Sequence, residues 1–151
     1  MRLFRIADCR HPVWDGTGAF LGGGRWNSPG RAVIFVSTSY ACALLEVLVH
    51  SGIGRVPQTD GVVVADVPEE VAVHRLELTD LPADWAAPDS AAARTLGDAW
   101  LDGLSSAVLL VPSAVAAFDW NALVNPLHPD AARIQVSPPV PVAWNASLFN
   151  C

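Results

Sequence analysis

The chain has 151 residues, of which 52% are hydrophobic and 16% charged, and its formal net charge at pH 7 is −6. This length and apolar content are sufficient for one compact domain. All nine positive side chains are arginines, and the absence of lysine excludes P-loop nucleotide hydrolases, protein kinases and pyridoxal-phosphate enzymes. The acidic balance argues against direct binding to nucleic acid, because such binding depends on cations that neutralise phosphates.

Membrane spans and metal sites are not indicated either. The apolar runs are much shorter than the roughly 18 residues that suggest a membrane span. The first residues, Met-Arg-Leu-Phe-Arg, do not have the pattern of a secretory signal. The three cysteines and four histidines are dispersed, whereas metal ligands usually cluster. We therefore expect a cytoplasmic protein with no membrane contact and no metal.

Short strands dominate the predicted secondary structure. Segments rich in β-branched residues and bounded by turn residues predict strands at 3–7, 32–37, 61–67, 73–78, 106–111, 132–137 and 139–144. No regular helical crossovers separate these strands, so a doubly wound parallel sheet is not expected. We predict an α+β fold over residues 1–151, a single domain with short, mostly antiparallel strands and two main helices.

The first predicted helix runs over 39–50, with its N-cap at Thr38 or Ser39. Its apolar residues recur at helical spacing and predict a core face made of Ala41, Leu44, Leu45, Leu48 and Val49. Glu46 lies off that stripe, beside Cys42 and His50. The charge of Glu46 has two interpretations: an exposed group that aids solubility, or a carboxylate at the edge of a groove that stabilises developing positive charge.

The second predicted helix runs over 90–101, with its N-cap at Asp89 or Ser90. The residues expected to pack inward from this helix are Ala92, Leu96, Ala99 and Trp100. The preceding residues, 78–90, contain two prolines and read as a surface loop with one aromatic anchor, Trp85.

A glycine-rich segment, Gly-Gly-Gly-Arg-Trp-Asn-Ser-Pro-Gly at 22–30, is the most unusual stretch of the chain. Its glycines, among them Gly24, permit close approach of a ligand to the backbone. The guanidinium of Arg25 suits phosphate oxygens, and Trp26 offers a flat face to a ring. The simpler interpretation is a turn with a buried tryptophan and a solvated arginine.

Ser113 follows a predicted buried strand, and Asn125 precedes a proline. Ser113 does not have the sequence context of a serine hydrolase nucleophile, since no G-x-S-x-G elbow surrounds it. Taken alone, both residue types are most often turn formers.

Five segments, in order along the chain, resemble the RES domain family: Phe4-Arg5-Ile6, the 23–30 segment, Ala43-Leu44-Leu45-Glu46, Val111-Pro112-Ser113 and Leu123-Val124-Asn125-Pro126. The family is named for its Arg, Glu and Ser, which correspond here to Arg25, Glu46 and Ser113. The resemblance implies a fold similar to ADP-ribosyltransferases and the toxin half of a type II toxin–antitoxin pair. It also implies an activity that degrades NAD⁺.

The same resemblance implies the partners. NAD⁺ is the substrate, and no separate cofactor is expected. The protein partner is an Xre-type helix-turn-helix antitoxin that blocks the active site and supplies the DNA binding. A homodimer of the chain within this complex is compatible with the resemblance, and the sequence leaves the oligomeric state open.

Roles for individual residues follow from the bond that is broken. Nicotinamide leaves as a neutral molecule, so no general acid is needed and the ribose passes through an oxocarbenium-like state. Glu46 is expected to stabilise that state, and Ser113 to orient ligand or carboxylate. Ligand contacts are expected from these residues: Arg5 and Arg25 on the diphosphate, Trp26 or Phe35 on a ring, and Gly24, Asn27 and Asn125 elsewhere.

Phe35 departs from the family pattern, in which the corresponding residue is usually Tyr. The acceptor of the ribose also stays open: water makes a glycohydrolase, phosphate a phosphorylase, and a protein side chain an ADP-ribosyltransferase. The alternative to an enzyme is a catalytically weakened module that binds an antitoxin without turnover.

Overall fold

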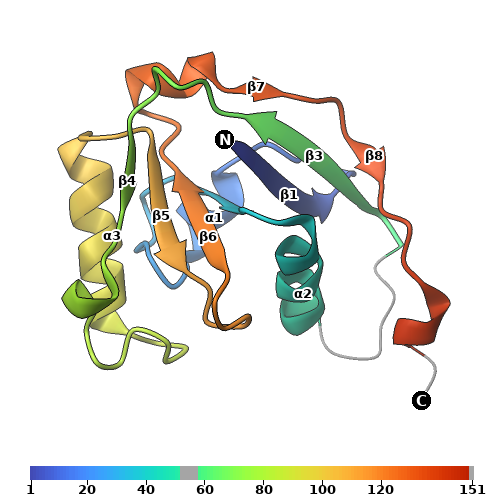
Figure 1. The fold of residues 1–151 in the computed structure, drawn as a ribbon, viewed down its shortest axis with the longest axis horizontal. Helices are drawn as coiled ribbons and strands as arrows, with labels where there is room; N and C mark the ends of the chain where they lie inside the picture. The colour runs from blue at the N-terminus through green and yellow to red at the C-terminus, as the bar shows by residue number, and fades with distance from the viewer. Residues whose placement is uncertain (52–57, 150–151) are drawn as a thin grey trace.

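One curled sheet of eight strands carries the fold of the computed structural model, which describes residues 1–51 and 58–149 (Figure 1). Residues 52–57 and 150–151 of the predicted domain lie outside this description. The strands are β1 (Arg2–Asp8), β2 (Ile34–Ser37), β3 (Asp60–Asp66), β4 (Val73–Arg75), β5 (Val108–Pro112), β6 (Trp120–Val124), β7 (Gln135–Val136) and β8 (Val140–Pro141). Their order is β4-β5-β6-β2-β1-β3-β7, with β8 also paired to β3.

The pairing in this sheet is antiparallel except between β4 and β5. The prediction of an α+β fold with mostly antiparallel strands is therefore confirmed. Strand β6 was not predicted, because its sequence, Trp-Asn-Ala-Leu-Val, is short and has a polar residue, Asn121, at its second position. The strand predicted at 132–137 is largely wrong: Pro129–Arg133 is a 3₁₀ helix, and β7 keeps two residues.

The α-helices are α1 (Thr17–Gly22), α2 (Tyr40–Ser51) and α3 (Ala91–Gly103). Helix α1 was not expected, whereas α2 and α3 confirm the two predicted helices. Ser39 and Ser90 cap them, since their hydroxyl oxygens accept from the backbone N–H groups of Cys42 and Ala93, each at 3.0 Å. Two further 3₁₀ turns lie at Leu78–Asp80 and Ala146–Leu148. No helix in the described part of the chain is long and apolar enough to cross a membrane.

The central strands of the sheet have two different faces. In antiparallel pairs, residues in register point to the same face. Val36 of β2 pairs with Ala122 of β6 and faces a core that also holds Leu3 of β1. On the other face, Phe35 pairs with Leu123 and packs beside α3. This second face also carries polar side chains, and it forms the floor of the site described below.

The core face predicted for α2 is partly wrong. Cys42 and Ala43 are the buried residues, while Leu45 and Val49 are 39% and 46% exposed. Ala43 packs on Ile6 of β1 and Val62 of β3, and this contact turns the polar edge of α2 toward the central strands. Helix propensity cannot specify the rotation of α2 about its axis, because this rotation depends on packing against β1 and β3 at the same time.

The core face of α3 also differs from the prediction. Ala92 and Ala99 are exposed, and the buried residues are Ala93, Gly97, Trp100 and Leu101. Gly97 accounts for the shift, because a Cβ there would stand 1.7 Å from the carbonyl oxygen of Trp26. The helix therefore presents its glycine, rather than its alanines, to the glycine-rich segment.

Candidate active site

A cavity of about 980 Å³ lies where α2, the central strands and the glycine-rich segment meet. Strands β2, β5 and β6 supply its floor, and Pro88, Asp89 and Arg94 line it from the side of α3. Seven of the residues selected from the sequence line it: Arg5, Gly24, Arg25, Trp26, Asn27, Phe35 and Glu46. The fold thus gathers side chains that are up to 41 positions apart in the chain, counting from Arg5 to Glu46.

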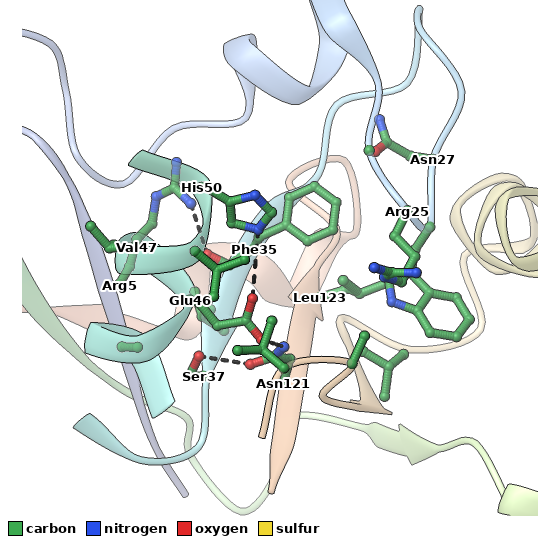
Figure 2. Close-up of a pocket in the computed structure, with 18 of the residues that line it drawn as sticks. Arg5, Arg25, Asn27, Phe35, Ser37, Glu46, Val47, His50, Asn121 and Leu123 are labelled. Carbon is green, nitrogen blue, oxygen red and sulfur yellow. Dashed lines mark hydrogen bonds and ion pairs between the residues drawn. The ribbon is translucent and has the colours of Figure 1, made fainter. Parts of the chain in front are cut away.

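Glu46 is held in a fixed orientation at the cavity wall (Figure 2). Its Oε1 accepts from Ser113 Oγ at 2.8 Å and from Asn121 Nδ2 at 2.6 Å. Its Oε2 lies 3.6 Å from Nε2 of His50, one turn later on α2. The carboxylate therefore has protein partners on both oxygens, as a preorganised electrostatic group requires.

These contacts keep Glu46 ionised. Burial raises the pKa of the Glu46 carboxyl, but the contact with His50 and the hydrogen bonds from Asn121 and Ser113 outweigh that effect and bring it below its usual value. Conversely, the contact with the Glu46 carboxylate raises the pKa of His50, against the opposing effects of burial and of the Arg25 charge. The Glu46 carboxyl group consequently carries a negative charge at neutral pH.

Arg25 reaches the cavity from the glycine-rich segment, on the opposite side of Phe35 from Arg5 (Figure 2). Its Nη1 donates to the carbonyl oxygens of Trp85 and Ala87, at 3.0 and 2.6 Å. These bonds tie the loop before α3 to the cavity rim. Among the described residues, Nε and Nη2 of the guanidinium have no hydrogen-bond partner, and both can donate to an anionic ligand.

Arg5 is engaged by the fold itself. Its guanidinium donates to the backbone carbonyls of Val13, Phe35 and Asp15, with 2.7 Å to Phe35 and 3.3 Å to Asp15. Burial lowers the pKa of Arg5, and the charge of Asp15 acts against that shift. The structure therefore gives Arg5 a role in joining β1 to the segment before α1 and to β2.

Trp26 and Asn27 combine cavity lining with packing. Trp26 is 3% exposed and stacks on Trp85 with ring centroids 6.0 Å apart, which confirms Trp85 as an anchor of the 78–90 loop. Asn27 is fully buried and donates through Nδ2 to the carbonyls of Ala19 and Arg31, both at 2.9 Å. Both side chains hold the glycine-rich segment in shape.

Gly24 and Phe35 meet directly. A Cβ on Gly24 would stand 2.8 Å from Cζ of the Phe35 ring, so the glycine leaves room for the ring to reach the cavity. Phe35 is half-buried and packs partly against the core beneath α3. Its ring forms part of the cavity floor.

Ser113 and Asn125 lie outside the cavity lining. Ser113 is 6% exposed; besides its bond to Glu46, its Oγ accepts from the backbone N–H groups of Val115 and Ala116. Asn125 is 1% exposed and donates to the carbonyl of Leu101, while its Oδ1 accepts from the N–H of Leu127. Ser113 thus contacts the Glu46 carboxylate, and Asn125 is a buried turn and packing residue.

Comparison with known proteins identifies the family. Residues 2–145 match the family model described as the RES domain. The chain belongs to the RES domain family. Its relatives include a protein named Toxin Res in Photorhabdus laumondii, 37% identical over 86% of this chain and 85% of the relative. Toxin Res of Pseudomonas putida is 39% identical over 90% and 93% of the two chains.

Two further comparisons bear on this RES domain. A Sphingobium protein named Prs ADP-ribosylating toxin is 38% identical over 80% of this chain and 77% of its own length. Among solved structures, the Mycobacterium tuberculosis MbcT–MbcA toxin–antitoxin complex contains a chain of similar fold, with a TM-score of 0.78 at 20% identity. That match covers 98% of this chain and 86% of the other.

Sequence reasoning missed two residues of the candidate site, Asn121 and Arg94. Asn121 lies on the unpredicted strand β6, and no pattern in the sequence links it to Glu46. Arg94 lies near the start of α3 and lines the same cavity as Arg25. The two arginines are far apart in the chain, so the sequence does not indicate that they share a cavity. His50 had a signal, because it is four residues after Glu46 on a predicted helix.

Proposed function

We propose that this RES domain is the toxin of a toxin–antitoxin pair and that it binds NAD⁺ in the cavity and breaks its nicotinamide–ribose bond. The observation that carries this proposal is the ionised, oriented carboxylate of Glu46 at the wall of a cavity of about 980 Å³. Pockets for small molecules and cofactors typically have volumes of roughly 300–1,000 Å³.

The charges around the cavity suit two parts of NAD⁺, its diphosphate and its nicotinamide ribose. Arg25 and Arg94 line the side near α3 and would bind the diphosphate. Glu46 lies on the α2 side of the cavity and would face the nicotinamide ribose, and the Phe35 ring lies between Glu46 and Arg25. Arg5 is already bonded to three backbone carbonyls, so we assign the diphosphate to Arg25 rather than to Arg5.

The reaction follows from heterolysis of the bond between ribose C1′ and the nicotinamide nitrogen. The bonding electron pair goes to nicotinamide, which leaves neutral, and the ribose becomes oxocarbenium-like. Glu46 stabilises that positive charge more than it stabilises the ground state, so it lowers the barrier. An acceptor oxygen then bonds to C1′ and loses its proton to solvent.

The acceptor is water or inorganic phosphate in our primary proposal, which makes the protein an NAD⁺ glycohydrolase or phosphorylase. ADP-ribosylation of a protein is the second candidate, and the 38% identical Sphingobium relative named Prs ADP-ribosylating toxin favours it. The partner would be an Xre-type antitoxin; a solved toxin–antitoxin complex of similar fold supports an antitoxin partner.

The test is to incubate the purified chain with NAD⁺, with and without inorganic phosphate, and to identify the products by chromatography and mass spectrometry. Nicotinamide with ADP-ribose indicates water as the acceptor, and nicotinamide with a phosphorylated ADP-ribose indicates phosphate. A protein acceptor would itself gain ADP-ribose. If folded, antitoxin-free protein releases no nicotinamide above the buffer control under any of these conditions, the chain is a binding module.

A further inference from the structure

The side chain of Asn121 links strand β6 to the Glu46 carboxylate through a hydrogen bond (Figure 2). In the sheet it is in register with Ser37 of β2 and Val111 of β5, on the face that forms the cavity floor. Because β6 is a central strand, with β5 on one side and β2 on the other, the backbone at Asn121 is fixed from both sides. Its side chain therefore projects from a rigid position.

The orientation of the Asn121 amide is determined by its neighbours. Oδ1 accepts from Ser37 Oγ at 2.7 Å and from Cys42 Sγ at 3.5 Å, while Nδ2 donates to Glu46 Oε1 at 2.6 Å. The reverse orientation would place Oδ1 against the carboxylate oxygen, where two acceptors repel each other. Ser37 and Cys42 are buried, so water does not compete strongly for these bonds.

Two neutral donors, Asn121 and Ser113, converge on Oε1 of Glu46. Ser113 also donates to Oε1, and its own hydroxyl is fixed by two backbone N–H groups. Oε2 is thereby left toward His50 and the cavity. A carboxylate held in this way does not need to reorient when charge develops on the ligand.

We propose that Asn121 is a positioning residue that fixes the Glu46 carboxylate for the reaction, and that Ser37 and Cys42 set the direction of its amide. This inference rests on the proposed function for its kinetic consequence. Its structural consequence, the ionisation of Glu46, does not depend on that function. The two parts can therefore be tested separately.

The kinetic arm uses Asn121→Asp, which preserves size and replaces the donor by an acceptor. We expect kcat for nicotinamide release to fall by about 10- to 10²-fold, while calorimetric NAD⁺ affinity changes by less than about 3-fold. Asn145→Asp is the matched control, since Asn145 is exposed and caps a 3₁₀ turn, and it should leave both quantities unchanged. A kcat within 3-fold of wild type in folded Asn121→Asp would overturn the proposal.

The ionisation arm follows the side-chain carboxyl signal of Glu46 by carbon NMR over a pH titration. Glu46→Gln identifies that signal by removing it. In Asn121→Asp the lost donor and the added negative charge should move the titration of this site to higher pH. Other titratable groups nearby are His50 and Cys42 on α2, Arg25, and Asp119 in the β5–β6 turn, and none of them is altered.

Ser37→Ala provides a second variant, because it removes the donor to Oδ1 without touching Glu46. Ser37→Ala should move the titration of Glu46 to higher pH by a smaller amount than Asn121→Asp. If Asn121→Asp does not fold, folded Ser37→Ala still tests the positioning role of Asn121. An unmoved titration in either folded variant contradicts the positioning role. If wild-type protein releases no nicotinamide but the titration moves, the proposed function fails and the positioning of Glu46 stands.

Discussion

The charge of Glu46 and its geometry can be separated by an isosteric substitution. Glu46→Gln keeps an oxygen that accepts from Ser113 or Asn121 but removes the negative charge. We expect kcat for nicotinamide release to fall by roughly 10²-fold or more, with NAD⁺ affinity nearly unchanged, because the charge acts mainly on the oxocarbenium-like state. Steady-state kinetics measures kcat, and calorimetry measures NAD⁺ affinity. Wild-type kcat in Glu46→Gln would show that the charge of Glu46 has no role in the reaction.

Arg25 is expected to affect binding as well as rate. It holds the carbonyls of Trp85 and Ala87 and offers its remaining N–H groups to the diphosphate. Arg25→Ala should weaken NAD⁺ affinity by about 10-fold or more, the loss of a charge-assisted hydrogen bond. Arg25→Lys should not restore it fully, since an ammonium cannot form the same two-pronged contact. Arg133→Ala on the exposed surface is the control, and equal affinities in the two alanine variants would refute this role.

Phe35 tests the effect of the missing hydroxyl. Its Cζ faces Gly24, so the hydroxyl of Phe35→Tyr would lie beside the backbone of the glycine-rich segment at the cavity. We expect a higher kcat for nicotinamide release with little change in NAD⁺ affinity, because the substitution restores the hydroxyl usual at this position in the family, on a ring that lies between Glu46 and Arg25. A lower or equal kcat in a folded variant would show that the ring only lines the floor.

At the scale of elements, two serine caps and a glycine contact position the walls of the cavity. Ser39 caps α2 about two turns before Glu46, and Ser90 caps α3 about one turn before Arg94. Each cap satisfies a backbone N–H group that would otherwise lack a partner at the helix start. The starting points of both helices, and with them the positions of Glu46 and Arg94, therefore depend on local sequence.

Gly97 gives a prediction about the contact between α3 and the glycine-rich segment. A Cβ in Gly97→Ala would stand 1.7 Å from the Trp26 carbonyl oxygen, so the helix or the segment must move. We expect destabilisation by about 1–3 kcal/mol or more, as in overpacked cores, despite the better helix propensity of alanine. Chemical denaturation measures it. Gly103→Ala, where a Cβ meets nothing within 4 Å, is the control, and equal stability of the two variants would contradict this contact.

At the scale of the whole molecule, the cavity joins segments from β1 to β6, so a ligand bound there should stabilise the fold as a unit. NAD⁺ at 100 times its Kd would add about 2.7 kcal/mol to the free energy of unfolding. For a chain of this size that corresponds to a rise in Tm of about 5–10 °C. Thermal denaturation with and without NAD⁺ tests this, with Glu46→Gln keeping the rise and Arg25→Ala reducing it. A Tm unaffected by NAD⁺ would contradict binding in the cavity.

Much of this protein follows from its sequence. Hydrophobic periodicity and caps are local signals, and they predicted α2, α3 and most of the strands. The ordered motifs around Arg25, Glu46 and Ser113 indicated the RES domain family, which the family match over residues 2–145 confirms. The roles of these residues in NAD⁺ cleavage stay predictions.

Only the tertiary structure decided how these elements face one another. The rotation of α2, which exposes Leu45 and turns Glu46 toward the sheet, depends on simultaneous packing against β1, β3 and the central strands. The pairing of β6 between β2 and β5 brings Asn121 to Glu46 across 75 residues of chain. Such contacts are non-local, and a pattern within one segment carries no information about which distant segment will satisfy its polar groups.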